Sequence, residues 1–295
     1  MQRNVGEFLP DGSVTEAKLS TALRQTLQRK NFLKNPNFAV IQSTASGTIA
    51  NSLALPTASL GYLGETEWWL AASGGTPAYA FSQLNENVTF TGAVGTTAIH
   101  LGQRIESRDA NKLKGKTVTL SVEISNSLLT SVTWELFNPT TTDDVHGTVA
   151  VPSQTLIATG TFTVSPTLTR YSATIVLPVG VSRGLGIRLR VGTQTSGTWV
   201  ISRLQLEEGA IATNFFCDDY LGELQKCKRY YFASNLFVAN GSSNVTTHSF
   251  VSMFATPIRV GGGAGYFIFS LNNEGVAHGQ TTQNVEAFTF SSHIP

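Results

Sequence analysis

The stretch SGTWVISRLQLEEGAIATNFFCDDYLGELQKCKRYY, residues 196–231, decides the fold class. Its first half sets apolar residues such as Trp199 and Leu206 between polar ones, as a half-buried β-strand requires. Gly209 ends that pattern. The second half, residues 220–231, mixes Leu with Glu, Lys and Arg and predicts a short amphipathic helix or turn. We therefore expect the closing strand of one β domain, followed by the hinge into another.

The chain between residues 32 and 216 predicts only strands and loops. Alternation is clearest in TVTLSVEI, residues 117–124, and about ten such segments are separated by Gly, Pro and Asn. This spacing favours a sandwich or jelly roll over βαβ units. A smaller β unit follows, with candidate strands at residues 235–239, 248–254, 265–271 and 285–290. We predict a mainly β protein: a jelly-roll β-sandwich with a short N-terminal helix and a smaller C-terminal β domain.

The N-terminal helix begins at a capping box, Ser13-Val-Thr-Glu16, in which a hydroxyl and a carboxylate each satisfy a free amide. Leu19, Leu23 and Leu27 lie on one face of this helix. So narrow an apolar stripe cannot bury itself alone. It either packs on its own β domain or joins copies of the chain, for example in a three-fold bundle.

Composition excludes several classes of partner. The 295 residues carry a formal net charge of +1 and only 13% charged residues, so nothing favours nucleic acid or an anionic membrane as partner. We expect no membrane insertion, because no run of about 18 apolar residues occurs. We expect Cys217 and Cys227 to be reduced thiols, although a disulfide between them is within reach.

The sequence contains no convincing catalytic pattern. The five histidines are dispersed, no G-x-S-x-G elbow occurs, and Ala110 stands where a phosphate loop ending at Gly115-Lys-Thr117 would need glycine. Glycosidases need two carboxylates across a sugar, and only a chance pair such as Glu65 and Glu67 could supply them. We expect a protein that is not an enzyme and has no cofactor.

Sugar binding needs less: an aromatic ring face, with polar side chains beside it for the hydroxyl groups. The candidate ligand-binding residues are Trp69, Trp68, Tyr62 and Tyr79. Adjacent residues of a strand face opposite ways, so at most one of the two tryptophans belongs to the core. For Trp69, a ligand, a contact between subunits and ordinary packing all remain open. Trp134 and Trp199 are expected in the core.

Several motifs together resemble the carbohydrate-binding-module-like jelly roll of many bacteriophage tail fibres. The matching segments, between about Asn31 and Tyr231, are NFLKNPNF (31–38), TEWW (66–69), QRIE (103–106), LKGKTVTLS (113–121) and the closing stretch quoted above. Two positions depart from the family pattern: Pro36 replaces its usual glycine, and Phe215-Phe-Cys-Asp-Asp219 replaces a charged segment.

The resemblance implies a virion protein, made in the bacterial cytoplasm and placed on the phage tail as a fibre or spike. Its expected partners are copies of itself in a homotrimer, other tail or baseplate proteins, and host-surface glycan. A structural Ca²⁺ is also implied, for which Asp218 and Asp219 are the candidate ligands. The alternatives are a head decoration or head-fibre protein and, second, a glycan-degrading enzyme.

We expect four parts. They are an N-terminal segment for attachment or oligomerisation (residues 1–30), the carbohydrate-binding-module-like sandwich (31–217), a hinge (218–231) and the C-terminal β domain (232–295).

Overall fold

The computed structural model describes residues 30–42, 45–49, 68–140, 142 and 154–228, together with the backbone of seven further strands. The expected N-terminal helix, with Leu19, Leu23 and Leu27, lies outside the described residues. No helix of the described part is long and apolar enough to cross a membrane.

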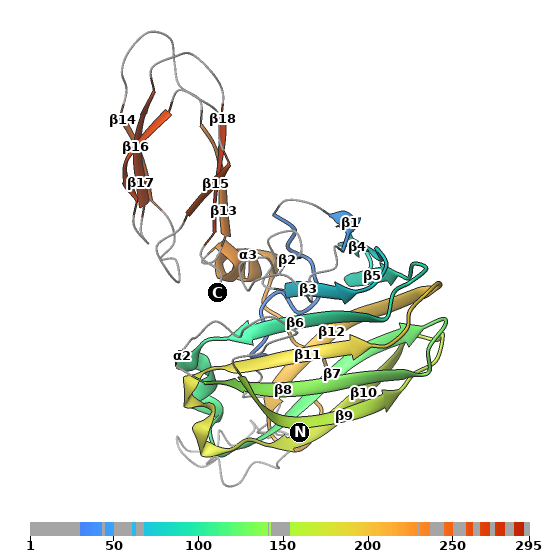
Figure 1. Ribbon diagram of the computed structural model, residues 1–295. Helices are drawn as coiled ribbons and strands as arrows, with labels where there is room; N and C mark the ends of the chain where they lie inside the picture. Colours follow the sequence, from blue (N-terminus) through green and yellow to red (C-terminus); the bar gives the residue numbers. More distant parts are fainter. Residues whose placement is uncertain are drawn as a thin grey trace, which may run out of the picture.

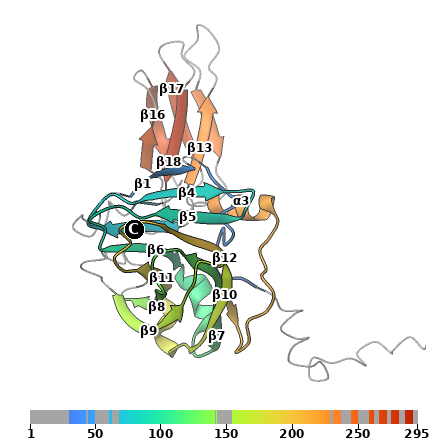
Figure 2. The ribbon, with the colours of Figure 1, turned by 90° about the vertical axis from the view of Figure 1, so that its right-hand side faces the viewer.

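Two six-stranded antiparallel sheets form the layers of a sandwich (Figures 1 and 2). Sheet A has the order β1 (Ser46–Thr48), β4 (Ala78–Ser82), β5 (Asn87–Thr91), β12 (Thr198–Glu208), β7 (Thr117–Asn126), β10 (Thr169–Val176). Sheet B has the order β2 (Gly61–Tyr62), β3 (Trp68–Ser73), β6 (Ala98–Ile105), β11 (Leu185–Val191), β8 (Ser131–Pro139), β9 (Gln154–Thr163). The chain crosses repeatedly from one sheet to the other. The predicted jelly-roll β-sandwich is confirmed.

Short helical segments and a second group of strands complete the described structure. The helical segments are α2 (Ser107–Ala110), η4 (Asn111–Leu113), η5 (Val179–Arg183) and α3 (Tyr220–Lys228). After α3, one three-stranded sheet contains β13 (Tyr231–Leu236), β18 (Glu286–Ser291) and β15 (Ile258–Gly261), and another contains β14 (Val245–Ser249), β17 (Gly275–Gln280) and β16 (Tyr266–Leu271). The sequence did not predict β15 and β17, because glycine and polar residues interrupt their alternation.

The core lies between the layers, where the alternating residues of each strand meet. Val118, Leu120, Val122 and Ile124 of β7 are all fully buried. Trp199 of β12 packs on Phe90 of β5 with ring centroids 4.9 Å apart. Burying each large apolar side chain contributes about 1.5–3 kcal/mol, so this alternation is what holds the two sheets together.

The lead-in segment (residues 30–42) is fixed to the sandwich at Asn35. This residue has a left-handed backbone (φ +46°), which asparagine tolerates better than most residues. Its side chain donates to the carbonyl of Val40 (2.8 Å) and accepts from the Val40 amide (3.0 Å). Its carbonyl accepts from Trp68 Nε1 (3.0 Å), and its amide donates to Glu223 Oε2 (2.7 Å). One asparagine therefore joins the start of the sandwich, strand β3 and helix α3.

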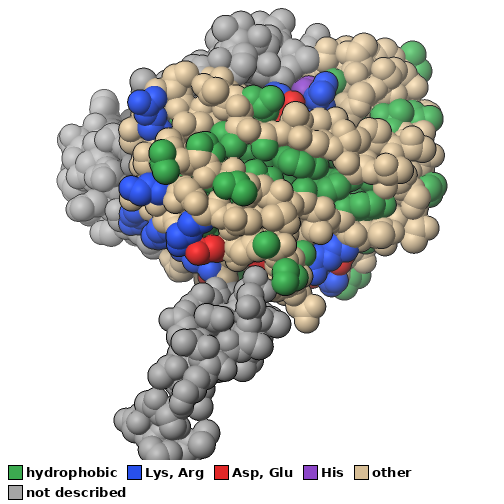
Figure 3. All heavy atoms as spheres, turned by 90° about the horizontal axis from the view of Figure 1, so that it is seen from below, with side chains coloured by type: hydrophobic (Ala, Val, Ile, Leu, Met, Phe, Trp, Pro, Cys, Tyr) green, Lys and Arg blue, Asp and Glu red, His purple; other side chains and the backbone are tan. Residues whose placement is uncertain are grey.

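The two lateral edges of the sandwich differ. At one edge, β1 and β2 contain only three and two residues. At the other edge, β9 and β10 contain ten and eight residues, and Arg170 is the single charged residue in these two strands. Trp134, Phe162 and Tyr171 form an aromatic row there, with centroids 6.4 and 5.6 Å apart. The view from below, the side of β9 and β10 in Figure 1, shows a band of hydrophobic side chains (Figure 3). We call β9 and β10 the open edge.

Replacing Asn35 by alanine should lower the free energy of unfolding by about 2–4 kcal/mol, because buried groups lose partners and the left-handed backbone becomes strained. Urea unfolding of the full chain measures this. The exposed Asn85 is the matched control, and Asn85→Ala should stay within about 0.5 kcal/mol. Equal effects of the two substitutions would contradict the assigned role of Asn35.

Candidate functional site

Part of the outer face of sheet A is covered by the protein's own chain. The segment after β12 runs back over this face, where Thr119 Oγ1 donates to the carbonyl of Gly209 (2.8 Å) and Thr174 Oγ1 to that of Ala210 (3.1 Å). Glu207 accepts from both the amide and the hydroxyl of Thr213 (2.8 and 2.6 Å). This explains why Thr119, Ser121 and Glu207 are buried although they point away from the core.

The outer face of sheet B carries a different set of side chains, in two cross-strand rows. The first row, from β3 to β9, is Trp69, Gly102, Arg188, Glu135 and Thr159. The second row is Ala71, His100, Arg190, Thr133 and Thr161. We call these ten residues the arginine face. Thr159 and Thr161 are exposed, whereas Trp69 and His100 are buried, so solvent reaches this face from the side of β9.

The first row combines an aromatic ring with an ion pair. Arg188 Nε donates to Glu135 Oε2 at 2.6 Å, and the Arg188 guanidinium lies 4.6 Å from the ring centroid of Phe137. The Trp69 ring lies directly over Gly102, where an added Cβ would come within 2.3 Å of it. A glycine on β6 is therefore required for this ring to lie against the sheet.

The second row contains nitrogen atoms without partners. His100 and Arg190 are directly opposite each other, on β6 and β11. His100 Nδ1 and Arg190 Nε are buried and have no hydrogen-bond partner in the described part of the chain. Buried polar groups are nearly always paired, so such atoms indicate a missing partner, such as a ligand or water.

The charges around His100 keep it neutral. Burial, and then the positive charges of Arg188 and Arg190, lower the pKa of His100 from 6.5 to about 3. At neutral pH this ring can therefore donate or accept a hydrogen bond, but it adds no charge.

The same pKa shift predicts a pH dependence of stability. Below pH 6.5, the ordinary pKa of histidine, His100 binds a proton in the unfolded chain. In the folded chain it stays neutral down to about pH 3. The contribution of neutral His100 to the free energy of unfolding is therefore fully present above pH 6.5. It is lost as the pH falls toward 3, by up to about 1.4 kcal/mol per pH unit. Urea unfolding between about pH 7 and about pH 4 should give a smaller loss for His100→Gln than for the wild type. Equal losses would contradict this account of His100.

The structure separates the aromatic residues expected from sequence. Trp68 is 1% exposed and lies inside the sandwich, whereas Trp69 faces the opposite side of β3 and is 8% exposed. Tyr79 packs against the core beside Phe81. The backbone of Tyr62 on β2 pairs with Trp69, next to the arginine face. Trp134 and Trp199 are both buried in the core, as expected.

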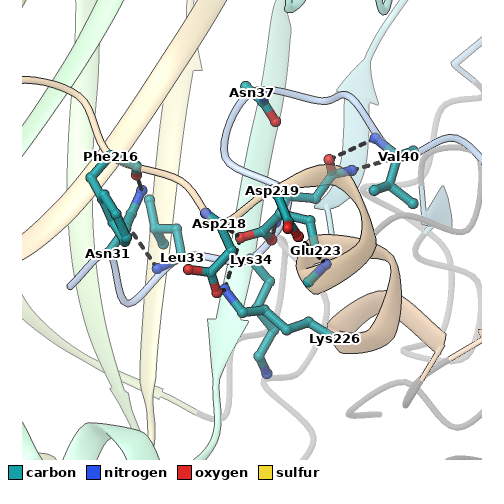
Figure 4. A network of polar contacts seen from close by, with 12 residues as sticks. Asn31, Leu33, Lys34, Asn37, Val40, Phe216, Asp218, Asp219, Glu223 and Lys226 are labelled. Atoms are coloured by element: carbon teal, nitrogen blue, oxygen red, sulfur yellow. Dashed lines mark hydrogen bonds and ion pairs between the residues drawn. The ribbon is translucent and has the colours of Figure 1, made fainter.

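Residues of the first segment, 31–38, and of the closing stretch meet in one network of polar contacts (Figure 4). Asn31 Nδ2 donates to the carbonyls of Leu204 (2.9 Å) and Phe216 (3.2 Å). The Gln103 side chain makes two hydrogen bonds with the backbone of Lys34, both 2.8 Å. Glu223, only 2% exposed, accepts from the amide of Asn35 and from Lys226 Nζ. These motif residues are engaged with one another and hold the lead-in segment and α3 in place.

Beside this network lies a hollow of about 440 Å³ that is lined by both charge types. Lys112 contacts Asp109 at 2.6 Å, and Lys226 contacts Asp218 at 2.7 Å. The pKa of Asp109 is lowered: burial opposes ionisation, but the hydrogen bond and charge of Lys112 outweigh it. Both carboxylates form ion pairs with lysine.

Both expected Ca²⁺ ligands contact groups of the protein. Asp218 pairs with Lys226, and Asp219 Oδ1 accepts from the Gly222 amide (2.7 Å) at the start of α3. In the described part of the chain, no three His, Cys, Asp or Glu side chains gather as a metal site would require. Cys217 and Cys227 are not joined by a disulfide.

Sequence reasoning missed His100, Arg188, Arg190 and Glu135. A signal was present in GIRLRV (186–191), where two arginines two residues apart interrupt an apolar strand. Because side chains alternate along a strand, such a pair must lie on one face of the sheet. Only the strand order shows that His100 and Glu135 lie on its two sides.

No protein-family model and no curated protein matches the chain. Among solved structures, it is similar to a family 4 carbohydrate-binding module, with a TM-score of 0.37, 15% identity, and coverage of 58% of this chain and 100% of that chain. A putative sugar-binding protein from Bacteroides thetaiotaomicron gives a TM-score of 0.40, 14% identity, and coverage of 61% and 100%. The enzymatically active domain of tailspike protein 4 of bacteriophage CBA120 gives 0.33, 17% identity, and coverage of 49% of this chain and 20% of that chain.

Proposed function

We propose that this protein is a bacteriophage virion protein, a tail fibre or spike component, that binds host-surface glycan through the arginine face without catalysing a reaction. The observation that carries this proposal is the second row, where two buried nitrogen atoms, on His100 and Arg190, have no partner in the described part of the chain. A sugar can supply those partners through its hydroxyl oxygens, while the neighbouring Trp69 ring offers an apolar contact.

The virion placement rests on the sequence resemblance, whose motifs run in order from about Asn31 to Tyr231. A head decoration or head-fibre protein would use the same sandwich on the capsid. Antibody labelling of particles distinguishes the two, because tail labelling supports the proposal and capsid labelling supports the alternative.

The chemistry of the arginine face favours binding over hydrolysis. Its two rows contain a single carboxylate, Glu135, which bonds to Arg188. A glycosidase needs two carboxylates on opposite sides of the scissile bond. The glycan-degrading alternative therefore has no support at this face.

A fibre with weak glycan sites gains avidity from several copies, and we propose the homotrimer expected from sequence. The open edge supports a contact between copies. Long edge strands in monomers are normally protected by charges, proline or shortness, as β1 and β2 are by shortness. The open edge has only Arg170, which donates to Ser121 Oγ and to the Thr213 carbonyl. Because the edge is otherwise uncharged, copies of it can meet without repulsion between like charges.

The trimer is tested by adding charge to the open edge. Leu156 and Val176 are 48% and 72% exposed there. The double variant Leu156→Lys, Val176→Lys should turn a trimer into a monomer in light scattering. Leu84→Lys, in the β4–β5 turn at a residue 93% exposed, should leave the trimer intact. A monomeric wild type, or a trimeric double variant, would contradict this contact.

Glycan binding is tested with purified full chain on an array of bacterial surface glycans. The wild type should bind at least one class, and Trp69→Ala should weaken that binding by about ten-fold, since losing a stacked aromatic contact costs on the order of 1 kcal/mol. The control is Tyr220→Ala, which removes a ring that is 51% exposed and lies on α3.

The array also decides against the proposal if the wild type binds no glycan. Equal weakening by Trp69→Ala and Tyr220→Ala would place the glycan elsewhere than on the arginine face.

A further inference from the structure

We propose that the glycan bound at the arginine face carries a carboxylate, as a uronic acid does, and that Arg190 receives this group beside the ring of His100. The inference rests on the proposed glycan binding and narrows its ligand class.

The charges on this face are unequal. Strand β11 places Arg188 and Arg190 two residues apart on the same side of sheet B. Arg188 is neutralised by Glu135 at 2.6 Å, and the side chains of both are only 12% exposed. Arg190 faces His100 on one side and Thr133 on the other, and neither carries a negative charge. Among the described residues no ion pair joins Arg190 to a carboxylate, and a half-buried guanidinium in such surroundings is stabilised by an anion that a ligand supplies.

The neighbours of Arg190 suit a sugar acid. His100 is neutral at pH 7, so it offers a hydrogen bond without competing for the anion. Thr133 and Thr161 continue the row toward solvent and provide hydroxyl groups for the rest of the sugar. Arg190 therefore lies between His100 and two threonines that extend the row to the solvent-exposed strand β9.

A carboxylate fits better than a bare ion because the guanidinium presents parallel N–H groups that match its two oxygens. On the same face, Arg188 Nε already donates to one carboxylate oxygen, Glu135 Oε2. A phosphate on a sugar shares this chemistry, so the test includes one.

The experiment is isothermal titration of the full chain with two trisaccharides, trigalacturonate and neutral galactotriose, and with two monosaccharides, galacturonate and galactose 6-phosphate. At about 50 mM salt, trigalacturonate should bind at least about ten-fold more tightly than galactotriose, and the difference should shrink at about 500 mM salt. Galactose 6-phosphate should bind more weakly than galacturonate as a monosaccharide. The reverse order would identify phosphate as the anion and overturn the carboxylate assignment.

Arg190→Gln should remove the preference for the acidic trisaccharide. Arg190→Lys should keep part of this preference because the positive charge remains. Arg108→Gln, which removes one exposed arginine of α2, is the control and should keep the full preference. If Arg190→Gln fails to fold, the comparison of acidic and neutral trisaccharides on the wild-type protein decides whether the ligand is acidic.

The outcomes separate this inference from the proposed function. Equal binding of acidic and neutral trisaccharides, or binding of neutral glycans alone, contradicts the proposal of an acidic ligand. Glycan binding itself would still be supported. Absence of binding to these ligands and to every glycan of the array overturns both.

Discussion

The sandwich depends on the left-handed turn at Asn35. The buried Asn35 side chain closes the turn, and its carbonyl accepts a hydrogen bond from the indole of Trp68. Its amide donates to the carboxylate of Glu223, which lies 188 residues further along the chain in helix α3. Asn31, Gln103 and Glu223 make further hydrogen bonds around this turn. These contacts give the segments 31–38, 103–106 and 196–231 a structural role in fixing the lead-in segment and α3 to the sandwich.

The two outer faces of the sandwich differ in what covers them. The chain that leaves β12 must return toward α3, and it does so across sheet A, where threonine hydroxyls and Glu207 satisfy its backbone. The returning segment thus covers part of that face. Sheet B keeps arginines, a histidine and a glutamate in the corresponding positions, including two nitrogen atoms with no partner in the described structure. A protein that retains such groups at a cost in stability is expected to use them for binding.

The sequence was sufficient for the fold class because alternation over residues such as Val118 to Ile124 depends only on local periodicity. It also predicted correctly that Trp68 and Trp69 face opposite ways. It could not rank the aromatic candidates, because whether a ring is core or surface depends on which strand lies opposite. The arginine face was missed for the same reason: Arg190, His100 and Thr133 belong to three strands whose neighbours are fixed by topology alone.

The most direct test of this account follows the four tryptophan indole N–H signals by NMR while a host-surface oligosaccharide is added. Trp68, Trp134 and Trp199 belong to the core between the sheets, and Trp69 alone lies on the arginine face. The account predicts that the Trp69 signal shifts on saturation while the other three stay in place. A shift of Trp134, which packs on Phe162 of the open edge, with Trp69 unchanged would contradict it.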